Sequence, residues 1–148
     1  MNVKIMPTIY LLVGIILCVA FHFSFPILFL IPSKWNLTGL IPLLFGIWIN
    51  LAADQALKVA ETTVKPYEES NALVQDGVYR FSRNPMYLGF VSILVGISVL
   101  LKSLSPYFVV FIFSVIVDQV FIKVEERMLK DKFGEVWRIY QSRVRKWI

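Results

Sequence analysis

Four long apolar stretches constrain this chain more than any other feature. They run roughly from Thr8 to Ile31, from Leu37 to Leu57, from Met86 to Leu101 and from Pro106 to Ile122. The chain is 57% hydrophobic over 148 residues, with a mean hydropathy of +0.69, which leaves too little polar surface for an ordinary soluble domain. We therefore expect an all-α, integral-membrane bundle of about four transmembrane helices, with the third span the shortest.

The connections between these stretches predict two antiparallel hairpins. Pro32 to Asn36 joins the first two spans and Lys102 to Ser105 joins the last two, and connections this short place successive helices side by side. The middle connection, from Lys58 to Pro85, is much longer. It contains aromatic and aliphatic residues rather than a disorder-type composition, so we expect an ordered loop.

The whole chain, 1–148, is thus expected to form one membrane domain. Its parts are a first transmembrane hairpin (1–57), a loop (58–85), and a second hairpin with a C-terminal helix (86–148). The first apolar stretch is expected to stay in the mature protein, because no Ala-x-Ala-like cleavage site precedes Pro32.

Basic residues predict the orientation of the bundle, since Lys and Arg gather in cytoplasmic loops. Lys34 and Lys102 fall on one side of the expected membrane, and all other Lys and Arg residues fall on the other side. Both termini, the middle loop and the active site should then be cytoplasmic. This asymmetry accounts for most of the net charge of +5, so the charge does not require nucleic-acid binding, and anionic membrane lipids are the favoured partners.

The lone cysteine and the lone histidine both lie in the first span. Cys18 has no second cysteine for a disulfide and no neighbouring ligands for a metal, and His22 follows one helical turn later. We expect both to serve packing, and we expect no metal site.

A polar, ring-rich segment precedes the third span and carries the first functional signal. Asp76-Gly77 predicts a turn, and Asn84-Pro85 predicts the N-cap and first residue of a helix. The positive end of that helix, with Arg80 and Arg83 beside it, would attract a carboxylate or phosphate. The alternative is a capped helix with two arginines placed by the positive-inside rule.

Acidic residues near the end of the fourth span carry the second signal. Asp118 lies in an apolar run, where acids are costly, and Glu125 follows seven residues later on the same expected helix face. Glu126 is adjacent. The alternative is that the glutamates pair with Arg127 or Lys130 on a solvated helix.

The remaining tail has an amphipathic pattern. Gly134 is expected to end or kink the helix, and the stretch 135–148 places aromatic residues such as Trp137 and Tyr140 among basic ones. The aromatic residues could lie at the membrane interface while the basic residues face headgroups. This segment could also cover a site.

Together the two signals resemble a known group of enzymes. They are similar to motifs of the isoprenylcysteine carboxyl methyltransferase and phospholipid methyltransferase group of integral-membrane methyltransferases. The residues that carry this resemblance are Gly77-Val78-Tyr79-Arg80, Arg83-Asn84-Pro85-Met86-Tyr87, then Glu125-Glu126 and Phe133-Gly134 with Tyr140. The resemblance covers about half the chain, from Leu73 to Ile148. The order and spacing of the motifs make the combination more specific than any single piece.

This resemblance implies S-adenosylmethionine as the methyl donor and a lipophilic small molecule or lipidated acceptor. It also implies that the catalytic residues are Arg83, Asn84, Glu125 and Glu126. The cofactor site would be lined by the residues Tyr79, Arg83, Asn84, Pro85, Tyr87, Glu125 and Glu126. A helix N-terminus suits the methionine carboxylate, and glutamates can accept hydrogen bonds from ribose or the amino group.

Three positions depart from the family pattern. Asn84 replaces a histidine, Trp137 replaces a common tyrosine, and Arg145-Lys146 replaces a Pro-Arg pair. Asn cannot take a proton, which mildly favours an acceptor that needs no strong base, such as a carboxylate. A prenylcysteine carboxylate and a phospholipid amine both stay open as acceptors. If a base is required, Glu125, Glu126 and Asp118 are the candidates.

Two other classes of function compete with this interpretation. Membrane sterol and fatty-chain reductases have a similar helix start and use reduced nicotinamide, but they are usually longer. A small scaffold or transporter subunit would need no cofactor, although it would leave the paired motifs unexplained. Oligomeric state and the identity of the membrane have no signal in the sequence.

Overall fold

The computed structural model describes residues 6–62 and 71–148, and within these ranges the chain is helical with no β-strand. The elements are α1 (Pro7–Ser24), η1 (Asn36–Gly39), α2 (Leu40–Val59), η2 (Gly77–Arg80), α3 (Pro85–Leu101), α4 (Ser105–Val117), η3 (Asp118–Ile122) and α5 (Lys123–Arg143). The expected all-α membrane bundle with a C-terminal helix is confirmed. Part of the expected ordered loop, residues 63–70, lies outside the described residues.

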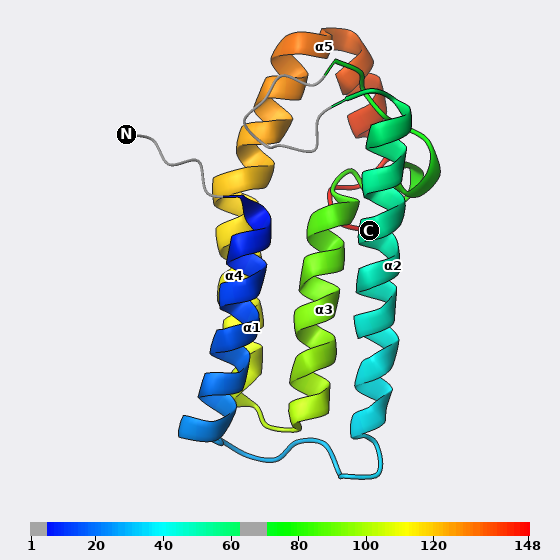
Figure 1. Ribbon diagram of the computed structural model, residues 1–148. Coiled ribbons are helices and arrows are strands. Elements are labelled where there is room, and N and C mark those ends of the chain that lie inside the picture. Colours follow the sequence, from blue (N-terminus) through cyan, green and yellow to red (C-terminus); the bar gives the residue numbers. More distant parts are fainter. Residues whose placement is uncertain (1–5, 63–70) are drawn as a thin grey trace.

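In the described part of the chain the bundle is formed by α1, α2, α3 and α4, and successive helices run in opposite directions (Figure 1). The α3 helix stands in the middle, α2 packs along one side of it, and α1 and α4 pack together on the other side. The expectation that the first two spans are neighbours is therefore wrong, because α1 and α2 lie on opposite sides of α3. The expectation that the last two spans are neighbours is confirmed, since α3 packs against α4.

The long connection between α1 and α2 explains this arrangement. The first helix ends at Ser24 rather than near Ile31, because Pro26 disfavours helical backbone at the residue before it, and Phe25 has φ −140° and ψ 66°. The chain then crosses beneath the bundle, held to the α3–α4 turn. There the Ile27 amide donates to Ser105 Oγ at 3.0 Å and the Leu104 amide donates to the Ile27 carbonyl at 3.0 Å.

Paired glycines allow α2 and α3 to approach closely. A Cβ on Gly46 would lie 2.5 Å from the Gly89 carbonyl oxygen, and a Cβ on Gly39 would lie 2.5 Å from the Gly96 carbonyl oxygen. Any side chain at these positions would push the two backbones apart. This contact fixes α2 against the helix whose start carries the candidate site.

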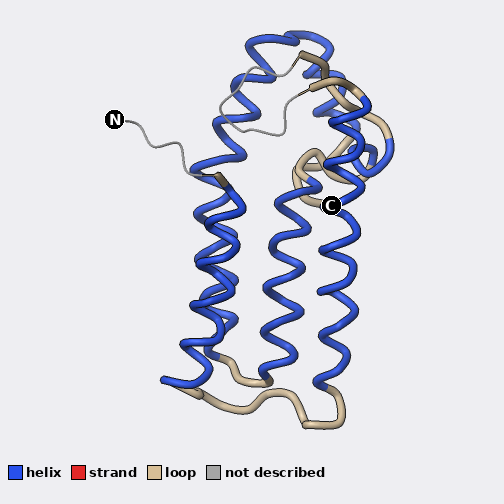
Figure 2. Tube along the Cα trace, in the orientation of Figure 1, coloured by secondary structure: helices blue, strands red, loops and turns tan. Residues whose placement is uncertain are grey.

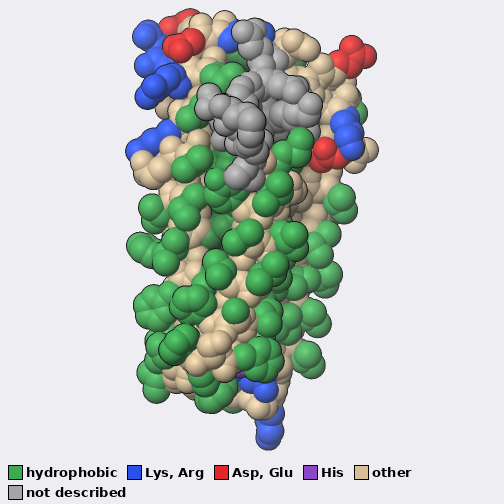
Figure 3. Space-filling model, turned by 60° about the vertical axis from the view of Figure 1, so that its left-hand side comes forward, with side chains coloured by type: hydrophobic (Ala, Val, Ile, Leu, Met, Phe, Trp, Pro, Cys, Tyr) green, Lys and Arg blue, Asp and Glu red, His purple; other side chains and the backbone are tan. Residues whose placement is uncertain are grey.

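The face of the bundle seen in Figure 3 is apolar along its length, and its charged side chains gather at the two ends. Among the described residues, three helices are long and apolar enough to cross a membrane: Pro7–Ser24, Asn36–Val59 and the continuous helix that starts at Ser105. The shorter α3 has 17 residues, or about 26 Å. The protein is therefore a membrane protein. Loops gather at the two ends of the helices (Figure 2).

The α5 helix extends beyond the bundle and then turns back (Figure 1). Gly134 has φ 50° and ψ −115°, a conformation that favours glycine, and it kinks the helix as expected. The returning half brings Trp137 and Tyr140 into the protein, where they are 2% and 3% exposed. Our expectation that these two rings lie at the membrane interface is therefore wrong, because the kink turns them toward η2 and the start of α3.

Both residues assigned to packing in the first span do pack. Cys18 is fully buried and its thiol lies 3.8 Å from the Pro106 carbonyl oxygen. His22 Nδ1 lies 2.7 Å from Ser103 Oγ, at the end of the bundle opposite α5. This histidine is therefore far from the candidate site described below.

Candidate functional site

The turn before α3 has the expected backbone but not the expected cap. Gly77 has φ +60°, as a turn glycine should, and Pro85 is the first residue of α3. The Asn84 side chain, however, does not accept a bond from the helix amides. Its Nδ2 instead donates to the Lys146 carbonyl oxygen at 3.0 Å, because the returning C-terminal segment places a backbone acceptor beside it.

The first contact between the two motif halves is an ion pair. Arg83 Nη2 lies 2.9 Å from Glu126 Oε1, and their side chains are only 8% and 17% exposed. Arg83 Nη1 donates to the Gln141 carbonyl oxygen at 3.2 Å, and the guanidinium lies 5.7 Å from the centre of the Trp137 ring. Glu126 thus pairs with Arg83, and the alternative in which it pairs on a solvated helix face is wrong for this residue.

A second contact lies one helical turn into α3. Tyr87 Oη donates to Glu125 Oε1 at 2.5 Å, and Tyr87 is 5% exposed. Burial raises the pKa of Glu125 to about 7, the bond from Tyr87 lowers it, and the nearby Glu126 carboxylate raises it. A carboxyl with this pKa exchanges its proton near neutral pH, which is the property of a general acid or base.

Tyr79 closes the site on the side of η2. Tyr140 Oη donates to the Tyr79 carbonyl oxygen at 2.7 Å, and both side chains are buried. Burial is the main cause that raises the pKa of each phenol, so both hydroxyls stay protonated. For Tyr79 the second cause is the Glu125 carboxylate, and Asp54 of α2 also raises the pKa of this phenol. An acid of α2 therefore contributes to the electrostatics of the candidate site.

Asp118 contacts a residue far away in the sequence. Its Oδ1 lies 2.5 Å from Lys146 Nζ. The helix widens into a π turn from Asp118 to Ile122, so the seven-residue spacing to Glu125 does not carry over as in a regular α-helix. Both acids nevertheless contact the same corner, Glu125 through Tyr87 and Asp118 through the C-terminal segment.

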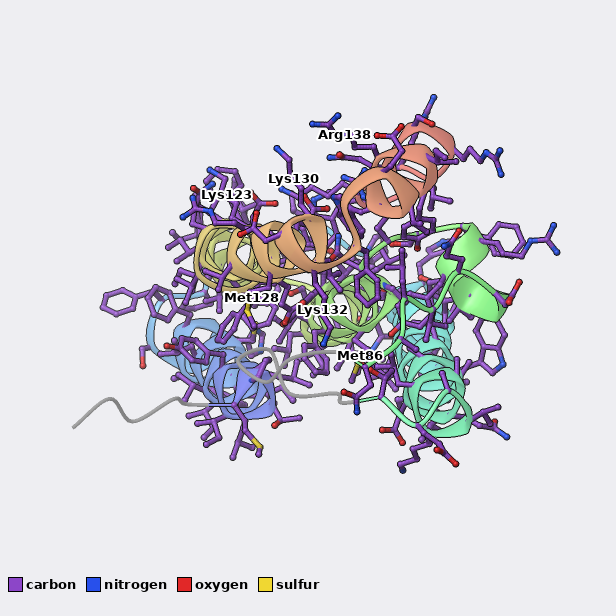
Figure 4. All side chains as sticks on the ribbon, turned by 90° about the horizontal axis from the view of Figure 1, so that it is seen from above. Met86, Lys123, Met128, Lys130, Lys132 and Arg138 are labelled. Atoms are coloured by element: carbon purple, nitrogen blue, oxygen red, sulfur yellow. The ribbon has the colours of Figure 1, made fainter. Side chains whose placement is uncertain are left out.

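The two sides of α5 differ in character (Figure 4). Lys123, Lys130 and Arg138 project away from the bundle, whereas Met128 and Lys132 lie over it, on the side of Met86 at the start of α3. The outer side of α5 thus carries Lys123, Lys130 and Arg138, and its inner side, marked by Met128 and Lys132, lies over the bundle.

The structure thus brings together most of the residues singled out by sequence. Glu126 pairs with Arg83 of the turn before α3, and Glu125 accepts a hydrogen bond from Tyr87 of α3. The buried residues Tyr79, Asn84 and Pro85 lie in the same turn and helix start. Arg80 does not join them, because its side chain faces outward.

Four further residues form this corner that sequence reasoning did not place there. They are Ser82, Trp137, Gln141 and Lys146. For the three residues of the tail, the signals were its possible role as a cover and the departures from the family pattern at Trp137 and Lys146.

Comparison with known proteins agrees with this geometry. Residues 35–136 match the phospholipid methyltransferase family, and this segment contains both the Arg83-Asn84-Pro85 turn and the Glu125-Glu126 pair. The chain belongs to the phospholipid methyltransferase family. A protein of Haemophilus influenzae named only as uncharacterized is 35% identical over 63 residues, which are 43% of this chain and all of that protein.

Family membership confirms the resemblance drawn from the motifs. It implies methyltransferase activity at a membrane, and it does not favour the reductase or scaffold alternatives.

Proposed function

We propose that this member of the phospholipid methyltransferase family transfers a methyl group from S-adenosylmethionine to a lipophilic acceptor at the cytoplasmic face of the membrane. The observation that carries the proposal is the meeting of the two motif halves. Arg83 pairs with Glu126 and Tyr87 with Glu125, so the start of α3 and the inner side of α5 form one buried polar corner.

The residues present fit the chemistry of this cofactor. Arg83 Nε is buried and donates to no acceptor in the described parts of the chain, so a carboxylate of the cofactor would find a free donor there. The positive end of α3 adds to that attraction. Glu125 and Glu126 could accept bonds from an ammonium or ribose hydroxyl and offset a sulfonium charge, and Tyr79 and Tyr87 would be its aromatic walls.

S-adenosylmethionine supplies an activated methyl group, so the protein needs to position the acceptor and stabilise charge. A prenylcysteine carboxylate is already anionic and needs no base. A phospholipid amine must first lose a proton, and Asn84 cannot take it. Glu125, with its pKa of about 7, is the residue here suited to that step.

Sidedness follows from the basic residues. The candidate site lies at the end of the bundle that carries α5 and its many Lys and Arg residues, whereas Lys34 and Lys102 lie at the other end. The positive-inside rule then assigns the site to the cytoplasm. The acceptor would reach it laterally, from the leaflet, with its polar head beside the Glu125 carboxyl.

Calorimetry with the purified protein in detergent tests the cofactor. We expect S-adenosylmethionine and S-adenosylhomocysteine to bind and reduced nicotinamide nucleotide not to bind. Glu125→Gln and Arg83→Ala should abolish S-adenosylmethionine binding. The matched controls are Glu135→Gln and Arg138→Ala, because Glu135 and Arg138 form an exposed ion pair at 3.6 Å on the same helix.

Unchanged affinity in Glu125→Gln and Arg83→Ala, with both proteins folded, would refute the assignment of these residues. Binding of reduced nicotinamide nucleotide alone would refute the methyltransferase proposal. The acceptor is tested by supplying cofactor with a labelled methyl group to membranes and to lipidated peptides. Mass spectrometry should then find the label as a methyl ester on a carboxylate or as an N-methyl group on a lipid amine.

A further inference from the structure

The last residues of the chain hold the turn that precedes α3. The Arg83 amide donates to the Arg145 carbonyl oxygen at 3.0 Å. The Lys146 carbonyl oxygen accepts from Asn84 Nδ2 at 3.0 Å and from Ser82 Oγ at 3.4 Å. Two successive carbonyls of the C-terminal segment thus bind three successive residues of the turn, and they fix both the backbone and the Asn84 side chain.

These contacts depend on how the segment itself is held. Its one ion pair in the described residues joins Lys146 Nζ to Asp118 Oδ1 at 2.5 Å, with side chains 28% and 20% exposed. Trp147, the next residue, packs against the hydrophobic core. Asp118 lies on the π turn that links α4 to α5, so this ion pair ties the C-terminus to the end of a transmembrane helix.

An acid next to the apolar end of a membrane helix is costly unless it is paired. Asp118 also accepts from Gln119 Nε2 at 3.2 Å, but Lys146 provides the opposite charge. The ion pair with the Lys146 side chain therefore explains an acid at position 118 even if Asp118 does not contact a substrate.

We propose that Asp118 is a positioning residue for the cofactor site, acting through Lys146. The ion pair holds the Arg145 and Lys146 carbonyls over Ser82–Asn84, and so sets the positions of the Arg83 and Asn84 side chains. This inference rests on the proposed function, because it assumes that Arg83 and Asn84 bind the cofactor. It adds Asp118 and Lys146 to the residues on which cofactor binding depends.

Breaking the Asp118–Lys146 ion pair should change cofactor affinity in one direction only. If the segment supports the site, breaking the ion pair should weaken cofactor binding. If the segment instead blocks the site, breaking the pair should strengthen binding, and the proposal is then wrong.

The experiment compares Asp118→Asn and Lys146→Met with the exchanged double variant Asp118→Lys/Lys146→Asp. Controls are Asp131→Asn and Lys130→Met, which remove charges from exposed positions of α5. Each protein is purified in detergent, its melting temperature is recorded, and S-adenosylmethionine affinity is measured by calorimetry. Hydrogen exchange followed by mass spectrometry measures protection of the Arg83 amide without any cofactor.

We expect each single variant to lose about tenfold in S-adenosylmethionine affinity and to exchange the Arg83 amide hydrogen about tenfold faster. The effect should be this large because a partly buried ion pair contributes more free energy than an exposed one. The exchanged double variant should recover part of both losses, which a general loss of stability would not do. The two controls should match the wild-type protein.

Three results would overturn the inference. They are unchanged affinity and exchange in Asp118→Asn, tighter binding in that variant, or no recovery in the exchanged double variant while it remains folded. If the wild-type protein does not bind S-adenosylmethionine at all, the proposed function fails and this inference fails with it. Wild-type binding with unchanged Asp118→Asn overturns this inference alone.

Discussion

The buried Glu125 carboxyl should make the protein less stable as pH rises toward and through neutrality. Burial raises its pKa to about 7 from the usual 4.5, so the folded protein holds a proton that the unfolded chain releases. Its contribution to stability is complete below about pH 4.5 and is lost as pH rises to about 7. The pKa difference corresponds to about 3 kcal/mol, at about 1.4 kcal/mol for each tenfold change in proton affinity.

Glu125→Gln should remove this dependence. Glutamine is neutral, has nearly the same shape and still offers an oxygen to Tyr87 Oη. We expect the variant to match the wild-type protein near pH 4.5 and to be more stable by about 3 kcal/mol at pH 8 and above. The same variant should lose cofactor affinity, so stability and function would move in opposite directions.

Thermal unfolding in detergent between pH 4.5 and 9 measures the effect, as the difference between the variant and the wild-type protein at each pH. Because other acids also titrate in this range, only that difference is interpreted. Glu135→Gln is the control, since the Glu135 side chain is 73% exposed and should show no such trend. A Glu125→Gln difference that stays constant with pH would refute the account of Glu125 as a buried, mostly protonated acid.

Three further predictions concern the elements that hold the site. Gly46→Ala should destabilise the bundle by about 1–3 kcal/mol in detergent melts, because its Cβ would lie 2.5 Å from the Gly89 carbonyl oxygen. Gly14→Ala is the control and should destabilise the bundle less, because the nearest atom to its Cβ would lie at 3.3 Å. Gly134→Ala should cost about 1–3 kcal/mol through its positive φ and should change tryptophan fluorescence, since the kink positions the returning half of α5. Tyr140→Phe should cost about 1–2 kcal/mol in the same melts, because a buried backbone carbonyl of η2 loses its donor.

The sequence predicted the elements of this fold well and their arrangement less well. Hydropathy located all four spans, and Gly77, Pro85 and Gly134 marked the turn, the helix start and the kink that the structure contains. The order of packing was wrong for α1 and α2. A short connection places two helices side by side only when both helices extend up to it. Pro26 ends the first helix at Ser24, so the actual connection is long enough for the chain to pass beneath the bundle to the other side of α3.

The candidate site was predicted as two separate motifs. Motif spacing placed Arg83 and Glu126 at the same end of the bundle, and the structure pairs them at 2.9 Å. The role of Asn84 as a side-chain cap was wrong, because the side chain is oriented to donate from Nδ2 to the Lys146 carbonyl oxygen and its Oδ1 accepts from no amide of the helix. No local pattern reveals a backbone acceptor that comes from so far along the chain.

By itself, the sequence determined that this protein lies in a membrane and where its four apolar helices begin, and its motifs indicated the family to which it belongs. The first two properties follow from composition, periodicity and local backbone preference, which act over a few neighbouring residues, whereas the family follows from the motifs alone. Only the tertiary structure decided which partners the buried charges have. Arg83 with Glu126 and Asp118 with Lys146 meet because α5 turns back at Gly134, and the free energy of a buried charge depends on its partner in space.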